Sequence, residues 1–328
     1  MRLAVTPFRL AAFAAVFAFL VIVFGAFVRL SNAGLSCPDW PTCYGRLTWP
    51  KHDAEIASAN EAFPDRPVES HKAWREQVHR FLAGGLILTT FALAALSWRR
   101  RRAPGQPWKV PLAASLLIVF QALLGMWTVT WKLKPVVVMA HLLGGMATFA
   151  LLVWTWARAT AVASPTRVPG LRPVLVAGLM LLVLQIALGG WTSSNYAAFA
   201  CGTDFPTCLG QWLPATDFRE AFVLWRGIGV DYEGGVLDGP ARVAIQLTHR
   251  GFALVVSLVL TALGLACLQV AAWRRFGATL LALLFLQLAL GVANVMAGLP
   301  LWIATLHNGV AALLLATLVA MLARSVER

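Results

Sequence analysis

Charged side chains are scarce in this sequence. Asp, Glu, Lys and Arg make up 12% of its 328 residues, whereas 59% of the residues are hydrophobic. Soluble globular domains carry about 25% charged residues, so the composition excludes an ordinary soluble protein and indicates that lipid surrounds most of the chain. Acidic residues are the rarest charged class, with 14 against 27 Lys and Arg, which gives a formal net charge of +13.

Long runs with few or no charges predict the membrane-spanning segments. Each is long enough to cross about 30 Å of hydrocarbon as a helix. The runs lie at residues 10–28, 81–98, 110–131, 135–157, 173–203, 251–273 and 276–323. The last run is too long for one helix, and residues 297–300, Ala-Gly-Leu-Pro, predict a turn that divides it. We therefore predict an all-α membrane protein with eight transmembrane helices, the first of which lacks a clear signal-peptide cleavage site.

The basic excess predicts how the chain lies in the membrane. Lys and Arg beside spans are typically retained in the cytoplasm. One set of helix ends carries fourteen bases and one acid, Glu327, and the other side carries thirteen of each. The fourteen bases are Arg2, Arg9, Arg99, Arg100, Arg101, Arg102, Lys109, Arg158, Arg167, Arg172, Arg274, Arg275, Arg324 and Arg328. We expect a bacterial inner-membrane protein with both termini in the cytoplasm, whose positive charge meets anionic lipid and gives no reason to invoke nucleic acid.

Four of the five cysteines lie in or beside two long loops, at about residues 30–72 and 204–241, that face the periplasm in this topology. Cys37 and Cys43 form one close pair, and Cys201 and Cys208 form the other. An oxidising compartment favours two disulfides. Such bonds either staple the loops or pass electrons, and zinc binding is a weaker alternative. Cys267 lies in a hydrophobic run, where we expect a small core residue.

An internal repeat organises the chain. Residues 39–45, Asp-Trp-Pro-Thr-Cys-Tyr-Gly, recur at 204–210 as Asp-Phe-Pro-Thr-Cys-Leu-Gly, an offset of 165. Other matches keep offsets of 163 to 170: Ser31-Asn32 with Ser194-Asn195, His79-Arg80 with His249-Arg250, Gln121 with Gln287, Gly125 with Gly291, and His141 with His307. Two four-helix units, residues 1–160 and 161–328, are thus predicted as bundles related by a pseudo-twofold axis along the membrane normal.

Each repeat contains two histidines about two turns inside a helix from its outer end, roughly 9 to 12 Å below the start. His79 and His141 belong to the first repeat, and His249 and His307 to the second. Paired imidazoles on facing helices are what axial ligation of a haem iron requires. Four histidines at matched depth near the outer face favour haem over isolated packing residues, with another metal as the alternative.

Glycines, glutamines and arginines near the histidines are further candidates for the site. Six glycines either leave room for a flat macrocycle or serve ordinary helix packing: Gly84, Gly85, Gly144, Gly145, Gly251 and Gly309. Gln121 and Gln287 are expected to form hydrogen bonds between helices. Arg80 and Arg250, which follow two of the histidines, either contact a haem propionate or only lie at the membrane surface.

The two repeats differ at a position that bears on chemistry. Glu76 lies three residues before His79, on the same helix face, whereas Gln246 occupies the matching position before His249. A carboxylate beside a haem can transfer protons and stabilise positive charge on a reacting carbon. The first repeat is therefore predicted to be the reacting half and the second a site of electron transfer. Alternatively, Glu76 only pairs with Arg80 at i+4.

These motifs together resemble the heme A synthase family over nearly the whole chain. They comprise residues 34–43, Glu76-x-x-His79-Arg80, His141, the second cysteine loop, Thr248-His249-Arg250 and His307-Asn308. The resemblance implies an oxidoreductase that converts a methyl group of haem o, through an alcohol, to the formyl group of haem a for terminal cytochrome oxidases. It implies that His79 and His141 hold haem o, Glu76 assists the oxidation, and His249 and His307 hold a permanent haem b.

Partners and alternative functions follow from the same residues. The resemblance also implies contact with haem o synthase and with cytochrome oxidase assembly factors, and a homo-oligomer stays open. The main alternative is a di-haem membrane cytochrome b that transfers electrons without oxidising a substrate. Such proteins usually hold haems near opposite membrane faces, whereas all four ligands are expected near one face here. A haem transporter without catalysis is the other alternative, but it gives no reason for Glu76 to break the repeat.

Overall fold

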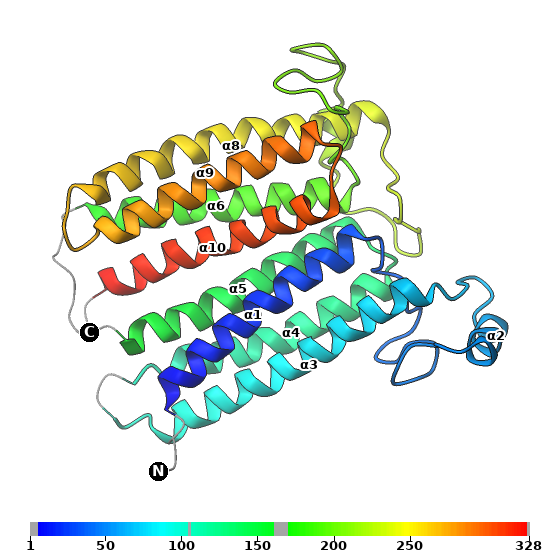
Figure 1. Ribbon diagram of the computed structural model, residues 1–328, viewed down its shortest axis with the longest axis horizontal. Helices are drawn as coiled ribbons and strands as arrows, with labels where there is room; N and C mark the ends of the chain where they lie inside the picture. The colour runs from blue at the N-terminus through cyan, green and yellow to red at the C-terminus, as the bar shows by residue number, and fades with distance from the viewer. Residues whose placement is uncertain (1–5, 104–105, 161–169, 327–328) are drawn as a thin grey trace.

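The computed structural model describes residues 6–103, 106–160 and 170–326, which form ten helices and no extended strand. Within these ranges, eight helices are long and apolar enough to cross a membrane. They are α1 (Pro7–Leu30), α3 (Ser70–Arg99), α4 (Lys109–Thr130), α5 (Pro135–Thr160), α6 (Leu171–Ser194), α8 (Gly239–Leu268), α9 (Arg274–Met296) and α10 (Leu301–Ser325), as Figure 1 shows. The all-α, eight-span prediction is confirmed, and the turn at 297–300 separates α9 from α10.

Two spans begin well before the hydrophobic runs that predict them. α3 begins at Ser70 rather than at residue 81, and α8 begins at Gly239 rather than at residue 251. Hydropathy marks only the part of a helix that lies in lipid, so polar turns at the aqueous end are missed. In α8, the side chain of Asp238 caps these turns by accepting a hydrogen bond from the Ala241 N–H at 2.9 Å. Both helices therefore extend past their neighbours toward the loops (Figure 1).

Each half of the chain forms a ring of four helices. In the first half, α1 and α4 each pack against both α3 and α5. In the second half, α6 and α9 each pack against both α8 and α10. Consequently α3 stands diagonally opposite α5, and α8 stands diagonally opposite α10. The pseudo-twofold axis between the rings stays a prediction, and so does the division at 160/161, because residues 161–169 lie outside the described ranges.

The two rings meet through contacts of α1 with α10, α5 with α10, and α5 with α6. α10 is the most enclosed span, since 61% of the residues in its most apolar 18-residue segment are buried. The corresponding share for α9 is 17%, because α9 lies at the periphery. Small side chains such as Ala11, Ala14 and Ala312, each 0% exposed, let the helices approach closely. Cys267 is buried in the same hydrophobic core as these alanines, which confirms the prediction that it is a small core residue.

The two long loops contain two short helices that hydropathy does not reveal, α2 (Asp53–Ala62) and α7 (Phe218–Ala221). Cys37 is bonded to Cys43, and Cys201 to Cys208, so both predicted disulfides are confirmed. The disulfide loops repeat each other closely: residues 44–45 and 209–210 have positive φ angles, and each loop contains one cis X-Pro bond. α1 begins and α10 ends at the opposite end of the bundle from these loops (Figure 1).

The orientation in the membrane stays a prediction. Four of the residues used for it, Arg2, Arg167, Glu327 and Arg328, lie outside the described ranges. At the helix ends that are predicted to be cytoplasmic, the described basic residues include Arg9 in the first turn of α1 and Arg99 at the end of α3.

Candidate functional site

The histidines of each half lie on the diagonally opposed helices. His79 on α3 is near enough to His141 on α5 for their charges to interact, and the same holds for His249 on α8 and His307 on α10. All four histidines are partly exposed as residues. His141 and His307 lie about 9 Å along their helices, as predicted. His79 and His249 lie about 14 and 15 Å along theirs, farther than the predicted 9 to 12 Å, because α3 and α8 start farther out.

Each imidazole lies against a glycine of a neighbouring helix. A Cβ added at any of these glycines would lie within 3.2 Å of the ring, and at Gly25 it would lie 2.7 Å from Nε2 of His79. Only glycine therefore lets the rings lie this close to the backbone of the neighbouring helix. The pairs are Gly25 with His79, Gly125 with His141, Gly189 with His249, and Gly291 with His307.

Glutamines hold two of the histidines in the same manner. Gln121 Nε2 lies 3.0 Å from His141 Nδ1 and also donates to the His141 carbonyl oxygen at 2.6 Å. Gln185 Nε2 lies 3.1 Å from His249 Nδ1 and donates to the His249 carbonyl oxygen at 3.1 Å. These bonds connect α4 with α5 and α6 with α8, and they restrict the rotation of both rings.

The other two histidines depart from this arrangement. Gln287 Nε2 lies 3.2 Å from Nε2 of His307 rather than from Nδ1. Both glutamines predicted to link helices thus do so. His79 has no hydrogen bond to its ring within the described part of the chain, and its ring stacks on Phe24 instead, with centroids 6.4 Å apart. Val21, four residues before Gly25, stands where Gln185 precedes Gly189.

The donor set fits a haem in each half better than a bare metal ion. A porphyrin supplies four ligands and needs only two axial ones, and each half offers two imidazoles on diagonally opposed helices. A bare ion needs more protein ligands, and the described residues contain no group of three or more His, Cys, Asp or Glu that could hold one. The loop cysteines are engaged in disulfides. The Nδ1 atom of His307 is buried without a hydrogen-bond partner among the described residues, a donor or acceptor still to be satisfied.

The six glycines singled out from the sequence serve different purposes. Gly144 and Gly145 make room for the side chain of Gln121, which holds His141. Gly85 and Gly309 are packing positions, because a Cβ there would meet Phe17 or Val23. The remaining two, Gly84 and Gly251, face open space.

Glu76 is enclosed and receives three hydrogen bonds. Its residue is 4% exposed. Arg80 Nη2 donates to Oε1 at 2.6 Å, while the Cys37 N–H and the Ser36 hydroxyl donate to Oε2 at 2.9 and 3.1 Å. The i+4 pair with Arg80 therefore forms, but it is only one of three contacts. The carboxylate also ties α3 to the first disulfide loop.

The second repeat makes the same tie with an amide. Gln246 Oε1 accepts a hydrogen bond from the Cys201 N–H at 2.8 Å, and Gln246 Nε2 donates to the Ala198 carbonyl oxygen at 2.8 Å. Ala200 precedes Cys201 as Ser36 precedes Cys37, so the second repeat lacks both the carboxylate and the hydroxyl. A neutral side chain is therefore enough to hold a disulfide loop, so the loop contact alone does not explain why residue 76 is an acid.

Arg80 and Arg250 bind the disulfide loops. Arg80 Nη1 donates to the carbonyl oxygens of Asp39 and Thr42 at 2.8 and 2.5 Å. Arg250 donates to the corresponding carbonyl oxygens of Asp204 and Thr207, both at 3.1 Å. These contacts give both arginines a structural role, and a propionate contact stays a prediction.

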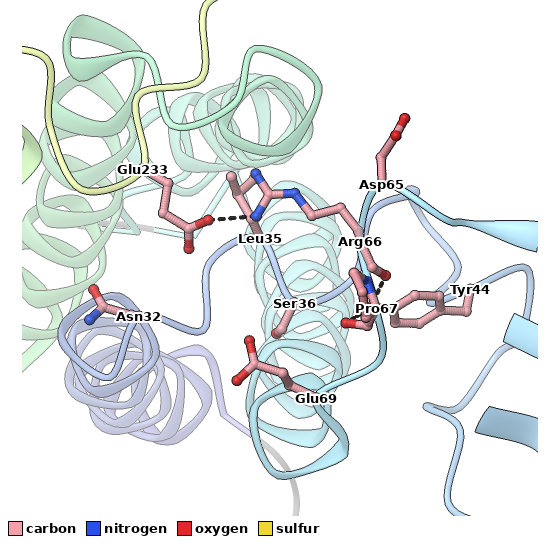
Figure 2. A pocket seen from close by; sticks show the side chains of 9 residues that line it. All are labelled: Asn32, Leu35, Ser36, Tyr44, Asp65, Arg66, Pro67, Glu69 and Glu233. Carbon is pink, nitrogen blue, oxygen red and sulfur yellow. Dashed lines mark hydrogen bonds and ion pairs between the residues drawn. The ribbon is translucent and has the colours of Figure 1, made fainter. Parts of the chain in front are cut away.

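A polar cleft of about 150 Å³ opens beside Ser36, between the two outer loops (Figure 2). Its acidic side chains are Asp65, Glu69 and Glu233. Arg66 bridges the repeats by donating to Glu233 and to Asp231 of the second loop, each at 2.5 Å. Ser36 thus touches the enclosed Glu76 on one side and lines a polar cleft on the other.

Several site residues were not identified from the sequence, although one signal was present. Gln-x-x-x-Gly occurs at 121–125, 185–189 and 287–291, and each motif places its glutamine and glycine against one histidine. Gly189 and Gln185 could have been found by searching for this motif, whereas Gly25 lacks it because Val21 stands in place of the glutamine. Ser36 carried no signal of its own, because its importance depends on which helix the loop meets.

Comparisons with known proteins match the chain over almost its whole length. The sequence pattern of the COX15-CtaA family, described as cytochrome oxidase assembly protein, matches residues 8–319. A protein named heme A synthase from Shewanella oneidensis is 46% identical over 307 residues, which cover 93% of this chain and 92% of that protein. Proteins of the same name from Beijerinckia indica and Caulobacter vibrioides are 31% and 30% identical, covering 94% and 91% of this chain and 89% and 90% of theirs.

Proposed function

Because the chain belongs to the COX15-CtaA family of cytochrome oxidase assembly proteins, we propose that it is a heme A synthase, a membrane oxidoreductase that acts on haem o. The reaction oxidises a methyl group of haem o to the formyl group of haem a through an alcohol. The observation that carries this proposal is one buried acid: Glu76 lies one turn from His79, where the second repeat has an amide. A protein that only stored or passed on haem has no use for this difference.

In this proposal the two repeats hold different haems. His79 and His141 hold the substrate haem o, and His249 and His307 hold haem b. When bound, haem b supplies reversible one-electron transfer. The amides of Gln185 and Gln287 restrict the rotation of both rings in the second repeat, which supports a permanent group there. His79, without such a bond, suits a group that must enter and leave.

Glu76 takes part in the oxidation by accepting protons and by its charge. Removing hydrogen from the methyl carbon releases protons, and a positioned carboxylate can take them up. Its negative charge also stabilises positive charge that develops on the reacting carbon. Three hydrogen bonds hold the carboxylate in one orientation, so it needs no rearrangement during the reaction.

We place both termini in the cytoplasm and the haem sites toward the periplasm of a bacterial inner membrane. The two disulfides support this, since such bonds persist in an oxidising compartment, and they lie at the opposite end of the bundle from the start of α1. Haem o synthase and cytochrome oxidase assembly factors are the proposed partners. Failure of haem o synthase to copurify in mild detergent would exclude a stable complex but not a transient one.

The experiment that tests the proposal replaces Glu76 by Gln, which copies the second repeat. The protein should still fold, because an amide already holds the second loop through Gln246. Haem a formation in cells should fall by about 100-fold or more, the usual size of an acid–base contribution. The control is Gln246→Glu, which should leave haem a formation near the wild-type level. Unchanged haem a formation in Glu76→Gln would remove the catalytic assignment.

A further inference from the structure

We propose that Ser36 and the polar cleft beside it form the path by which protons pass from Glu76 to the outer aqueous phase. The inference rests on the proposed function, because it concerns protons released when a methyl group is oxidised. It adds a residue and a route that the reaction requires, since Glu76 is 4% exposed and has little direct contact with water.

Only one of the three hydrogen-bond partners of Glu76 can relay a proton. Arg80 stays protonated at any physiological pH, so its guanidinium donates but does not accept. The Cys37 N–H is a backbone amide and likewise only donates. The hydroxyl of Ser36, 3.1 Å from Oε2, both donates and accepts. By elimination, a proton that leaves Glu76 through its bonded partners leaves through Ser36.

The cleft supplies water and proton acceptors on the far side of Ser36. A volume of about 150 Å³ holds several water molecules, and its polar lining can bind them. Figure 2 shows Ser36 and Glu69 lining the same cleft, with Arg66 and Glu233 closing it toward the second repeat. Burial, and then the charge of Glu76, raise the pKa of Tyr44 to about 12, so this phenol stays neutral. The acceptors are therefore water and the carboxylates of Asp65, Glu69 and Glu233.

The transfer needs no group beyond these residues and water. Glu76 passes its proton to the oxygen of Ser36, while the hydroxyl proton of Ser36 moves to a water molecule in the cleft. The hydroxyl has one proton, so it donates either to Glu76 or to the Ala33 carbonyl oxygen, which lies 2.6 Å away and holds the hydroxyl in place between transfers.

The second repeat provides an internal control. Its disulfide loop is held by Gln246 in the same way, yet Ala200 replaces the serine and an amide replaces the acid. The hydroxyl and the carboxylate are thus present together in one repeat and absent together in the other. If Ser36 only shaped the loop, the closely similar second loop would need an equivalent.

The test compares Ser36→Ala with Ser36→Thr, which keeps the hydroxyl, and with Ala200→Ser as a control in the second repeat. Purified full-length enzyme is assayed for haem o oxidation in H₂O and in D₂O, and haem binding is followed by absorption spectra. Ser36→Ala should lower the rate about tenfold or more and increase the ratio of the rates in H₂O and D₂O, with unchanged haem binding. Ser36→Thr should stay within about twofold of wild type, and Ala200→Ser should change nothing.

Two results would overturn the proton path while leaving the proposed function intact. One is a wild-type rate and isotope ratio in Ser36→Ala. The other is an equal loss of rate in Ser36→Ala and Ser36→Thr with an unchanged isotope ratio, which would assign Ser36 to packing of the loop. A wild-type enzyme that forms no haem a would instead contradict the proposed function itself.

Discussion

The two repeats hold their disulfide loops with the same backbone contacts but with different side-chain chemistry. In the second repeat, the side-chain amide of Gln246 accepts a hydrogen bond from the Cys201 N–H, and the residue before Cys201 is Ala200. In the first repeat, the carboxylate of Glu76 accepts a hydrogen bond from the corresponding Cys37 N–H, and the Ser36 hydroxyl donates to the same carboxylate. A neutral residue is therefore sufficient for the architecture. The charge and the hydroxyl of the first repeat are additions that need a functional explanation.

The histidines show a second difference between the repeats. Both histidines of the second repeat are bonded to glutamines, whereas in the first repeat only His141 is. Val21 takes the place of the fourth glutamine, and the ring of His79 lies against Phe24 and Gly25. The repeat with the acid is thus also the repeat with the less constrained ligand. Both differences support the proposal that exchange and chemistry belong to the first repeat.

The largest effects should come from filling the glycine positions that face the imidazoles. Gly25→Ala brings a methyl group to 2.7 Å from His79 Nε2, and Gly189→Ala brings one to 3.1 Å from His249, so each ring must move. We expect each variant to lose haem affinity in its own repeat by about 10-fold to 100-fold. Extracted haems, quantified by chromatography, measure this loss. Gly251→Ala, which faces open space, should bind haem normally, and a wild-type haem content in Gly25→Ala would contradict the packing described.

Removal of the disulfides should have intermediate effects that test whether the loops are equivalent. Each bond closes a short loop, with sequence separations of 6 and 7, so each double Cys→Ser variant should lose about 2 kcal/mol of stability. Thermal unfolding in detergent, monitored without reductant, measures the loss. If both bonds are structural, haem a formation should fall in parallel with stability in the two variants. A selective loss with Cys37 and Cys43, at equal stability, would instead assign electron transfer to the first pair.

Some parts of this structure leave a direct signal in the sequence, and others do not. Hydropathy identified all eight spans, and the repeat identified both disulfide loops, because burial in lipid and local motifs leave direct signals. The polar outer turns of α3 and α8 were missed, since they lie beyond the hydrocarbon. Glu76 stood out as a break in the repeat. Ser36 and Gly25 did not, because their meaning depends on which helices become neighbours, and a single sequence does not specify those contacts.

The smallest effect should come from the ion pairs that join the repeats outside the membrane. Arg66 bonds Asp231 and Glu233, but all three side chains are 30% or more exposed, so water and salt weaken the pairs. Arg66→Ala should lower the unfolding free energy by no more than about 1 kcal/mol, with less effect at high salt. Arg46→Ala, which breaks a pair within the first loop, is the matched control. A loss of several kcal/mol in Arg66→Ala alone would show that the loops stabilise each other more than exposed ion pairs allow.

The central claim, that the repeats hold different haems, is tested most directly by identifying the haems that copurify with the protein. Wild type, His79→Ala and His249→Ala would be purified in parallel, and their haems extracted and separated by chromatography. We predict that haem o and its oxidised products disappear only in His79→Ala, and that haem b disappears only in His249→Ala. Two equivalent haem b groups in wild type, with no haem o or haem a, would contradict the account and favour a cytochrome that only transfers electrons.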